Sequence, residues 1–233
     1  MKWKMKWTFF YLLTAAAVLL GVHLGNRTVT VMSERIADAE DIRIVIDPGH
    51  GGVDGGATSC TGKLESSYNL EIALRLHDLL RLMGYDTCLI RTEDVSVYTK
   101  GETIAQKKMS DLKERVRMVN EREKTLLISI HQNFYPDSQY SGAQVFYPET
   151  DGSRNLAEAI QRAFVQTINP GSRRQAKKCS GVYLMEHIQC TGILVECGFL
   201  SNPEEAELLT TKDYQQKVCC VIAATVGSYL SNT

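Results

Sequence analysis

The sequence lacks several features that would assign it to a common functional class. It has no excess of one charge, with 26 Lys+Arg against 27 Asp+Glu and a formal net charge of -1, whereas nucleic-acid binding normally shows as a basic excess or stripe. It contains no internal repeat and no low-complexity tract. We therefore expect no nucleic-acid partner and, from 233 residues, one catalytic-sized domain.

Compact cysteine and histidine motifs are also missing. There is no Cys-x-x-Cys pair, no Cys/His knuckle and no His-Glu-x-x-His run. The seven cysteines are an odd number, so in an exported protein at least one thiol stays free or pairs between chains. Most lie in apolar stretches, where we expect them to pack in the core as small hydrophobic side chains. They are Cys60, Cys88, Cys179, Cys190, Cys197, Cys219 and Cys220.

The amino-terminal segment has the order of an export signal. Lys2, Lys4 and Lys6 precede an apolar run from Trp7 to Leu20, as in a charged n-region followed by an h-region. The run approaches the ~20 residues that span a bilayer, and no clean Ala-x-Ala site follows it, so retention as a one-pass anchor is favoured over cleavage. We expect residues 1–24 to be a signal peptide or signal anchor, 25–41 a polar linker and 42–231 an exported catalytic domain that touches the membrane only through this first segment.

The remainder alternates between strand and helix patterns. A β-branched strand at 43–47 runs into Pro48-Gly49, and an amphipathic helix at 65–84 has Ser66 or Ser67 to cap its start and Gly84 to end it. We predict further strands at 86–91, 126–131, 143–147, 181–185 and 192–197, further helices at 111–123, 153–168, 203–210 and 214–230, and a surface loop at 93–106. This alternation predicts an α/β domain with a mostly parallel sheet flanked by helices.

Two histidines stand where predicted strands end. His50 lies in a glycine-rich turn at 47–52, and His131 terminates the strand that precedes it. A single histidine is more often structural, but α/β sheets gather their ligand-binding residues at strand ends. The two together indicate a candidate ligand pair.

Two glutamates complete the candidate site. Glu65 precedes the helix at 65–84, where it would either stabilise the helix start or bind a metal. Glu196 interrupts an apolar run, and a carboxylate there is costly unless it is paired or functional. Two histidines and one carboxylate leave the fourth position of a tetrahedral zinc open, as in hydrolytic sites. A second glutamate would then move the proton from water to the leaving amine of an amide.

The remaining polar candidates are ambiguous. Arg91 leaves a strand at the same edge and would either bind a substrate carboxylate or make a structural ion pair, and Asn133 would orient the site by hydrogen bonding. We expect His77 on a helix face, His187 in a solvated loop, and the charged helix at 111–123 to be a solvated face without function.

The contexts of these residues resemble the zinc-dependent N-acetylmuramoyl-L-alanine amidase family over about residues 42–230. The motifs are Ile-Asp-Pro-Gly-His-Gly-Gly at 46–52, Glu65 with Asn69-Leu70, Arg91-Thr92, Ser-Ile-His-Gln-Asn at 129–133 and Val-Glu-Cys-Gly-Phe-Leu-Ser-Asn at 195–202. The resemblance implies a mixed, mainly parallel sheet, zinc on His50, Glu65 and His131, and catalytic Glu196. It also implies cleavage between N-acetylmuramic acid and the L-alanine of the stem peptide.

The short form, an export segment and one amidase domain, looks like the germination-specific type that modifies spore cortex. That likeness implies a part in muramic-lactam formation and a place in the wall or the forespore intermembrane space. A vegetative autolysin, a non-catalytic wall-binding relative and a zinc peptidase of the stem peptide remain as alternatives. The sequence leaves open whether an activating protein partner is needed.

Overall fold

The computed structural model describes residues 42–232. The expected export segment at 1–24 and linker at 25–41 lie outside the described residues. Between residues 42 and 232, no helix has both the length and the apolar character that crossing a bilayer requires.

A single mixed sheet organises the described residues. Its strands are β1 (Arg43–Pro48), β2 (Thr87–Leu89), β3 (Thr125–Asn133), β4 (Gln144–Tyr147), β5 (Lys177–Lys178) and β6 (Thr191–Phe199), in the order β2-β1-β3-β6-β4-β5. All neighbouring pairs are parallel except β4 with β6. The expected single α/β domain with a mixed, mainly parallel sheet is confirmed.

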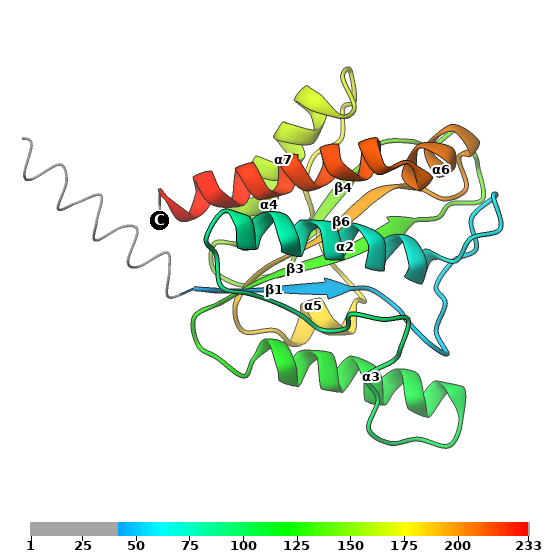
Figure 1. Cartoon of the computed structure of the whole chain (residues 1–233), viewed down its shortest axis with the longest axis vertical. Helices are drawn as coiled ribbons and strands as arrows, with labels where there is room; N and C mark the ends of the chain where they lie inside the picture. The colour runs from blue at the N-terminus through cyan, green and yellow to red at the C-terminus, as the bar shows by residue number, and fades with distance from the viewer. Residues whose placement is uncertain (1–41, 233) are drawn as a thin grey trace, which may run out of the picture. The chain divides into compact units, whose positions relative to one another are not determined.

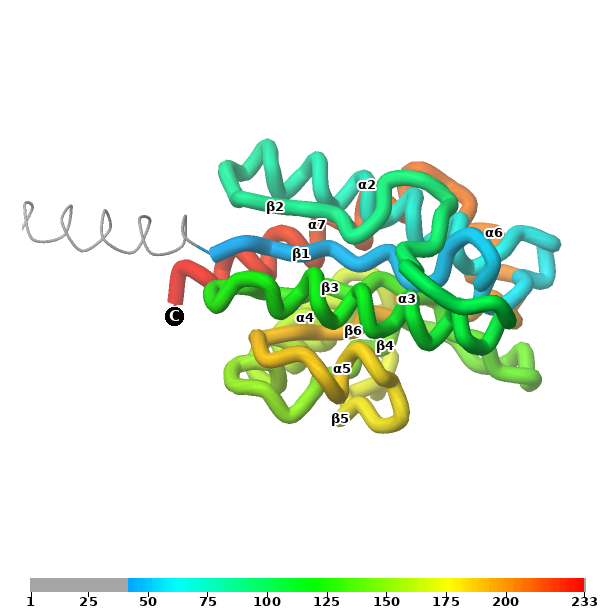
Figure 2. Tube along the Cα trace, turned by 90° about the horizontal axis from the view of Figure 1, so that it is seen from below, coloured from blue at the N-terminus to red at the C-terminus, as the bar shows by residue number. Residues whose placement is uncertain are grey.

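Helices cover both faces of this sheet (Figures 1 and 2). One face carries α2 (Glu65–Leu82), α4 (Ser153–Thr167) and α7 (Lys212–Leu230), and the other carries α3 (Ile104–Val119) and α5 (Tyr183–His187). Helix α6 (Pro203–Thr210) follows β6 directly. Because β1, β3 and β6 run parallel, their carboxyl ends and the segments that follow them meet at one edge of the sheet.

The alternation of side chains along the strands separates two kinds of surface. Toward α2 and α7 the strands present mainly apolar residues, among them Ile44, Ile46, Ile128, Ile130 and Val195, all fully or almost fully buried; the buried Gln132 near the end of β3 is polar and donates to Asn69 of α2. Toward α3 and α5 they begin apolar and become polar at their carboxyl ends. The apolar part is Val45, Leu127 and Leu194, which pack with side chains of α3 and α5; the polar part is Asp47, Ser129, His131 and Glu196, aligned by the register of β1, β3 and β6.

The predicted strand at 181–185 is wrong, because Tyr183–His187 is the helix α5. Its aromatic and branched side chains favour a strand locally, but the helix buries Leu184 and Met185 together against the sheet. The edge strand is instead β5, whose two lysines are exposed and carry no apolar signal.

Helix starts also differ from the expectation. Helix α3 begins at Ile104, inside the expected loop, because Thr103 and Gln106 form a reciprocal capping box. Helix α2 begins after Leu64 without a side-chain cap, so neither Ser66 nor Ser67 serves that role. The other predicted helices and strands appear with ends shifted by a few residues.

Candidate metal centre

The turn after β1 brings two imidazoles close together. His50 has a φ of 59°, in the left-handed region that residues other than glycine rarely adopt. A Cβ at Gly49 would lie 2.2 Å from the His131 ring, so only glycine allows the turn to pass there. The two ring centroids are 5.1 Å apart and nearly perpendicular.

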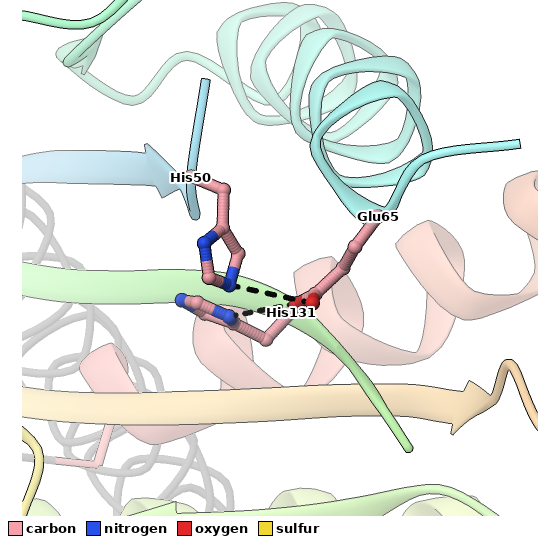
Figure 3. A group of neighbouring side chains, drawn as sticks. All are labelled: His50, Glu65 and His131. Atoms are coloured by element: carbon pink, nitrogen blue, oxygen red, sulfur yellow. Dashed lines mark hydrogen bonds and ion pairs between the residues drawn. The ribbon is translucent and has the colours of Figure 1, made fainter. Parts of the chain in front are cut away.

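Glu65 joins the two imidazoles (Figure 3). One carboxylate oxygen, Oε2, lies 3.3 Å from His50 Nε2, and the other, Oε1, lies 3.0 Å from His131 Nδ1. One possible ligand atom from each residue lies within 4.8 Å of the others. The turn after β1, the first residue of α2 and the strand β3 thus bring together three of the residues that the sequence singles out.

Backbone and side-chain donors hold the Glu65 carboxylate in place. The amides of Ala57 and Gln132 donate to it at 3.0 and 3.2 Å, and Asn69 Nδ2 donates to it at 3.4 Å and to Gly49 O at 3.1 Å. Burial alone would raise the pKa of Glu65, but hydrogen bonds and charges from His131 and His50 prevail and lower it well below its usual range. Glu65 is therefore held as an ionised carboxylate between the two imidazoles.

A second carboxylate, which the sequence analysis missed, holds His50 from its other nitrogen. Asp54 Oδ2 lies 3.0 Å from His50 Nδ1, and Lys108 Nζ of α3 lies 3.0 Å from the same oxygen. Burial opposes ionisation of Asp54, but the contacts with Lys108 and His50 prevail and lower its pKa. A carboxylate on the remote nitrogen fixes the tautomer and orientation of a ligating imidazole. Its position in the glycine-rich loop, four residues after His50, was the available signal.

Beneath the site lies a buried ion pair. Arg115 of α3, 2% exposed, pairs with Asp47 of β1, and Ser129 Oγ donates to Asp47 at 2.7 Å. Arg115 also donates to the carbonyls of Pro48 and His50 at 2.9 and 2.7 Å. Burial would raise the pKa of Asp47, but the charge of Arg115 prevails and lowers it. The prediction that this helix is only a solvated face is wrong for Arg115.

Arg91 is directed at the backbone rather than at the cluster of His50, Glu65 and His131. It is 3% exposed and donates to the carbonyls of Pro48, Gly49, Ser66 and Glu93 at 2.9–3.0 Å. Burial lowers its pKa to about 10. These contacts favour a structural role, although through carbonyl groups rather than the ion pair considered from sequence.

Asn133 lies at the last position of β3, beyond a register shift that separates it from His131. It is half-buried, and its carbonyl accepts a hydrogen bond of 2.8 Å from the Leu200 amide. The structure places it beside the end of β6 rather than among the ligand atoms.

Glu196 lies next to His131, as its register partner on β6. Its Oε2 is buried and has no hydrogen-bond partner within residues 42–232. Burial raises the pKa of Glu196 to about 7; the charges of His131 and His50 oppose the rise, and that of Glu65 adds to it. A carboxyl group with one buried, unpaired oxygen thus lies in the polar part of this sheet face.

A cavity of about 270 Å³ opens beside these groups. His50, His131 and Glu196 line it from the strand ends, while Lys108 and Tyr183 line it from α3 and α5. An ionised carboxylate with two imidazoles is the donor set of a hydrolytic zinc site that keeps one position open. The unpaired Glu196 oxygen supplies an acceptor for a proton beside it.

The other histidines and the cysteines lie apart from this cluster. His77 Nδ1 contacts Thr87 Oγ1 at 2.9 Å on the half-buried face of α2, and exposed His187 stacks on Tyr183 at the end of α5. All seven cysteines lie in the described residues and are free. The expected core packing holds for Cys179, Cys197 and Cys219, two others are half-buried, and Cys60 and Cys220 are exposed.

Comparison with known proteins identifies close likenesses. The family described as N-acetylmuramoyl-L-alanine amidase matches residues 44–228. A germination-specific N-acetylmuramoyl-L-alanine amidase of Bacillus subtilis is 39% identical over 191 residues, which cover 81% of this chain and 79% of that protein. The amidase LytC of the same organism is 31% identical, over 80% of this chain but 35% of its own length. The solved CwlD amidase of Clostridioides difficile, in complex with the GerS lipoprotein, is 34% identical with a TM-score of 0.78, over 83% of this chain and 100% of that chain.

Proposed function

This chain belongs to the N-acetylmuramoyl-L-alanine amidase family, and from that premise we propose how its residues perform the hydrolysis. The enzyme is a peptidoglycan amidase. We propose that zinc is its metal, that His50, Glu65 and His131 hold it, and that Glu196 is its catalytic acid and base. The bond cut joins N-acetylmuramic acid to the L-alanine of the stem peptide.

The observation that carries this proposal is the convergence of three ligand atoms within 4.8 Å beside an unpaired buried carboxylate oxygen. When bound, zinc supplies a Lewis acid and lowers the pKa of its water toward ~7. Asp54 and Lys108 orient His50 from behind, and the buried pair Asp47–Arg115 fixes the turn that carries it. The protein thereby presents a preorganised donor set.

Glu196 transfers the proton. It accepts the proton of the attacking water as the water oxygen bonds to the carbonyl carbon, and then delivers that proton to the nitrogen as the carbon–nitrogen bond breaks. The products are a free carboxyl group on the muramic acid and a free amine on L-alanine. A carboxyl group whose pKa is raised to about 7 is suited to both steps near neutral pH.

The first test separates metal binding from proton transfer. Glu196→Gln should lower kcat by about 10²- to 10⁴-fold, because general acid–base catalysis contributes on that scale, and should keep about one zinc per chain. His131→Ala should lose the zinc itself. Exposed Glu207→Gln is the matched control and should keep both. Full turnover by Glu196→Gln would disprove the assigned role, and zinc bound equally well by His131→Ala would disprove the ligand set.

The second test identifies the bond. Mass spectrometry of digested peptidoglycan should show glycan with free muramic acid residues and intact stem peptides with a free amino-terminal L-alanine. Cuts within the peptide would instead identify a zinc peptidase.

We further propose that residues 1–24 export the enzyme and that it acts in spore cortex maturation. The relative named as germination-specific, similar over most of its length, supports this assignment over a vegetative autolysin. The solved relative in complex with a lipoprotein supports a protein partner for this chain as well. Deletion of the gene should remove muramic lactam from spore peptidoglycan and leave vegetative muropeptides unchanged; the reverse pattern would assign it to the vegetative wall.

A further inference from the structure

The loop between β3 and β4 carries exposed aromatic rings. Phe134, Tyr135 and Tyr140 are 49%, 52% and 44% exposed, and we call them the aromatic platform. Single exposed apolar side chains are common on protein surfaces and need no explanation. Three exposed aromatic residues in one loop are more than scattered single side chains, and exposed apolar side chains that gather on a surface often mark interaction sites.

The tyrosine rings of the platform already pack against other aromatic rings of the protein. The Tyr135 and Tyr140 rings meet edge to face at 4.9 Å, and Tyr140 stacks on Phe199 of β6 at 6.4 Å. The Arg174 guanidinium lies over the Phe199 ring, 4.8 Å from its centre. Aromatic rings have few torsions to lose on binding, so a prepacked set of rings offers contact area at low entropic cost.

Hydrogen bonds fix the loop that presents these rings. The Tyr135 amide donates to Ser201 Oγ at 3.2 Å, and Asn202 Nδ2 donates to the Ser138 carbonyl at 2.9 Å. Arg174 Nε donates to the Ser141 carbonyl at 2.9 Å. The loop is therefore anchored to the segment after β6 at one point near its start and another near its middle.

The platform shares an edge of the sheet with the metal centre. Phe134 directly follows β3, which carries His131, and the loop leaves the carboxyl end of that strand (Figure 1). The Leu200 amide donates to Asn133 O, and the Cys60 amide donates to Leu200 O, at 2.8 and 3.0 Å. The last residue of β3, directly before Phe134, is thus joined through Leu200 to the loop between His50 and Glu65.

We propose that the aromatic platform binds the glycan strand of the substrate, with the C–H faces of its sugar rings stacked on the aromatic faces. This inference rests on the proposed function, which requires a polymer whose sugar chain continues beyond the cleaved bond. The cavity of about 270 Å³ beside Glu196 holds only a short part of such a polymer. Flat aromatic rings with polar neighbours such as Asp137, Gln139 and Asn202 suit a sugar, which has apolar faces and a hydroxyl rim.

Binding alone tests the platform directly. Glycan strands stripped of stem peptide contain no bond that the enzyme cuts, so calorimetric titration with the zinc-loaded enzyme reports affinity without turnover. Tyr135→Ala and Tyr140→Ala should each weaken binding by about 2- to 10-fold, the scale of one aromatic contact. Tyr135→Phe and Tyr140→Phe keep the ring and should bind as the unmodified enzyme does. Leu82→Ala, at an exposed residue on the far end of α2, is the control.

Unchanged affinity in the alanine variants, or no binding of peptide-free glycan by the unmodified enzyme, would overturn the proposal. Phe134→Ser provides the same measurement if the loss of a tyrosine unfolds the loop.

Kinetics separates this proposal from the proposed function. On polymeric peptidoglycan the alanine variants should raise KM with little change in kcat, and on a single N-acetylmuramoyl-peptide they should match the unmodified enzyme. If the unmodified enzyme cleaved neither substrate, the proposed function would fail, while the titration would still decide whether the platform binds glycan. Equal loss on both substrates would assign these tyrosines to general folding and reject the glycan site.

Discussion

The two faces of the same sheet differ most at the carboxyl ends of the strands. Toward α2 and α7, Ile46, Ile130 and Val195 continue the apolar core close to the carboxyl end of each strand. One residue away, on the opposite face, Asp47 and Glu196 are carboxylates. The first face gains stability by burying apolar area, whereas the second buries charges that are costly unless paired. Stability and chemistry therefore come from alternate residues of the same strands.

The buried charges of the polar face are also linked to its chemistry. Arg115 neutralises Asp47 and, through two carbonyls, holds the turn of His50. Asp54 holds the His50 ring, and Glu65 holds both imidazoles. Changes on this face should therefore alter zinc affinity, while changes on the apolar face should alter stability alone.

The largest effect should follow removal of Arg115. Arg115→Ala leaves Asp47 buried without its partner, which costs about 3–5 kcal/mol of unfolding free energy, and it also frees the His50 turn. Denaturant unfolding of the metal-free protein measures the first effect, and competition with a chelator measures the second. Arg117→Ala, on the same helix but in an exposed pair with Glu114, should cost under about 1 kcal/mol.

Ile128→Ala gives the matching test on the apolar face. It removes a fully buried side chain and should cost about 2–5 kcal/mol, but zinc affinity in the folded protein should stay unchanged. Equal zinc affinity in the Arg115 and Ile128 variants would remove the distinction between the two faces.

An intermediate effect should follow removal of Asp54. Asp54→Ala should lower zinc affinity by about 10- to 100-fold, as loss of a carboxylate behind a ligating histidine typically does, with a small change in stability because the site is partly exposed. Chelator competition measures the affinity, and Asp54→Asn, which keeps a hydrogen-bonding oxygen, should recover part of it. Asp86→Ala, which removes an exposed partner of Arg43 and Arg122, is the control. If the control lost as much zinc affinity, Asp54 would have no specific role.

The sequence predicts the elements that form the apolar face better than the contacts that form the polar face. Strands β1, β3 and β6 and helix α2 are found close to where the apolar patterns place them, because local burial periodicity reports them directly. Glu196 stands out because it interrupts an apolar run, and His50 and His131 stand out because they follow or end predicted strands. Glu65 has no such signal, since its place before a helix is equally typical of a residue that stabilises the helix start.

Partners from distant segments have no such local signal. In the sequence, Arg115 is one of several charged residues on a charged helix. Only the packing of α3 against β1 shows that it pairs with Asp47, which is 68 residues away. Helix α5 and strand β5 were missed for a related reason. The burial of Leu184 and Met185 against the sheet overrides a local strand preference, and a two-residue edge strand of exposed lysines has no apolar pattern.

The smallest effect is expected from labelling of the exposed thiols. The rate at which the buried thiols react reports whether the apolar face stays closed. Exposed Cys60 and Cys220 should react with a maleimide within minutes at neutral pH, whereas buried Cys197 and Cys219 should react only on unfolding. Burial raises the pKa of Cys219 to about 12, and that of Cys197 also rises well above its usual value, so few thiolates form. Peptide mass mapping locates the labels. Because neither exposed thiol lies among the proposed metal ligands, labelling should leave zinc content and stability nearly unchanged. Reaction of Cys219 as fast as its neighbour Cys220 would show that the apolar face opens in the native state.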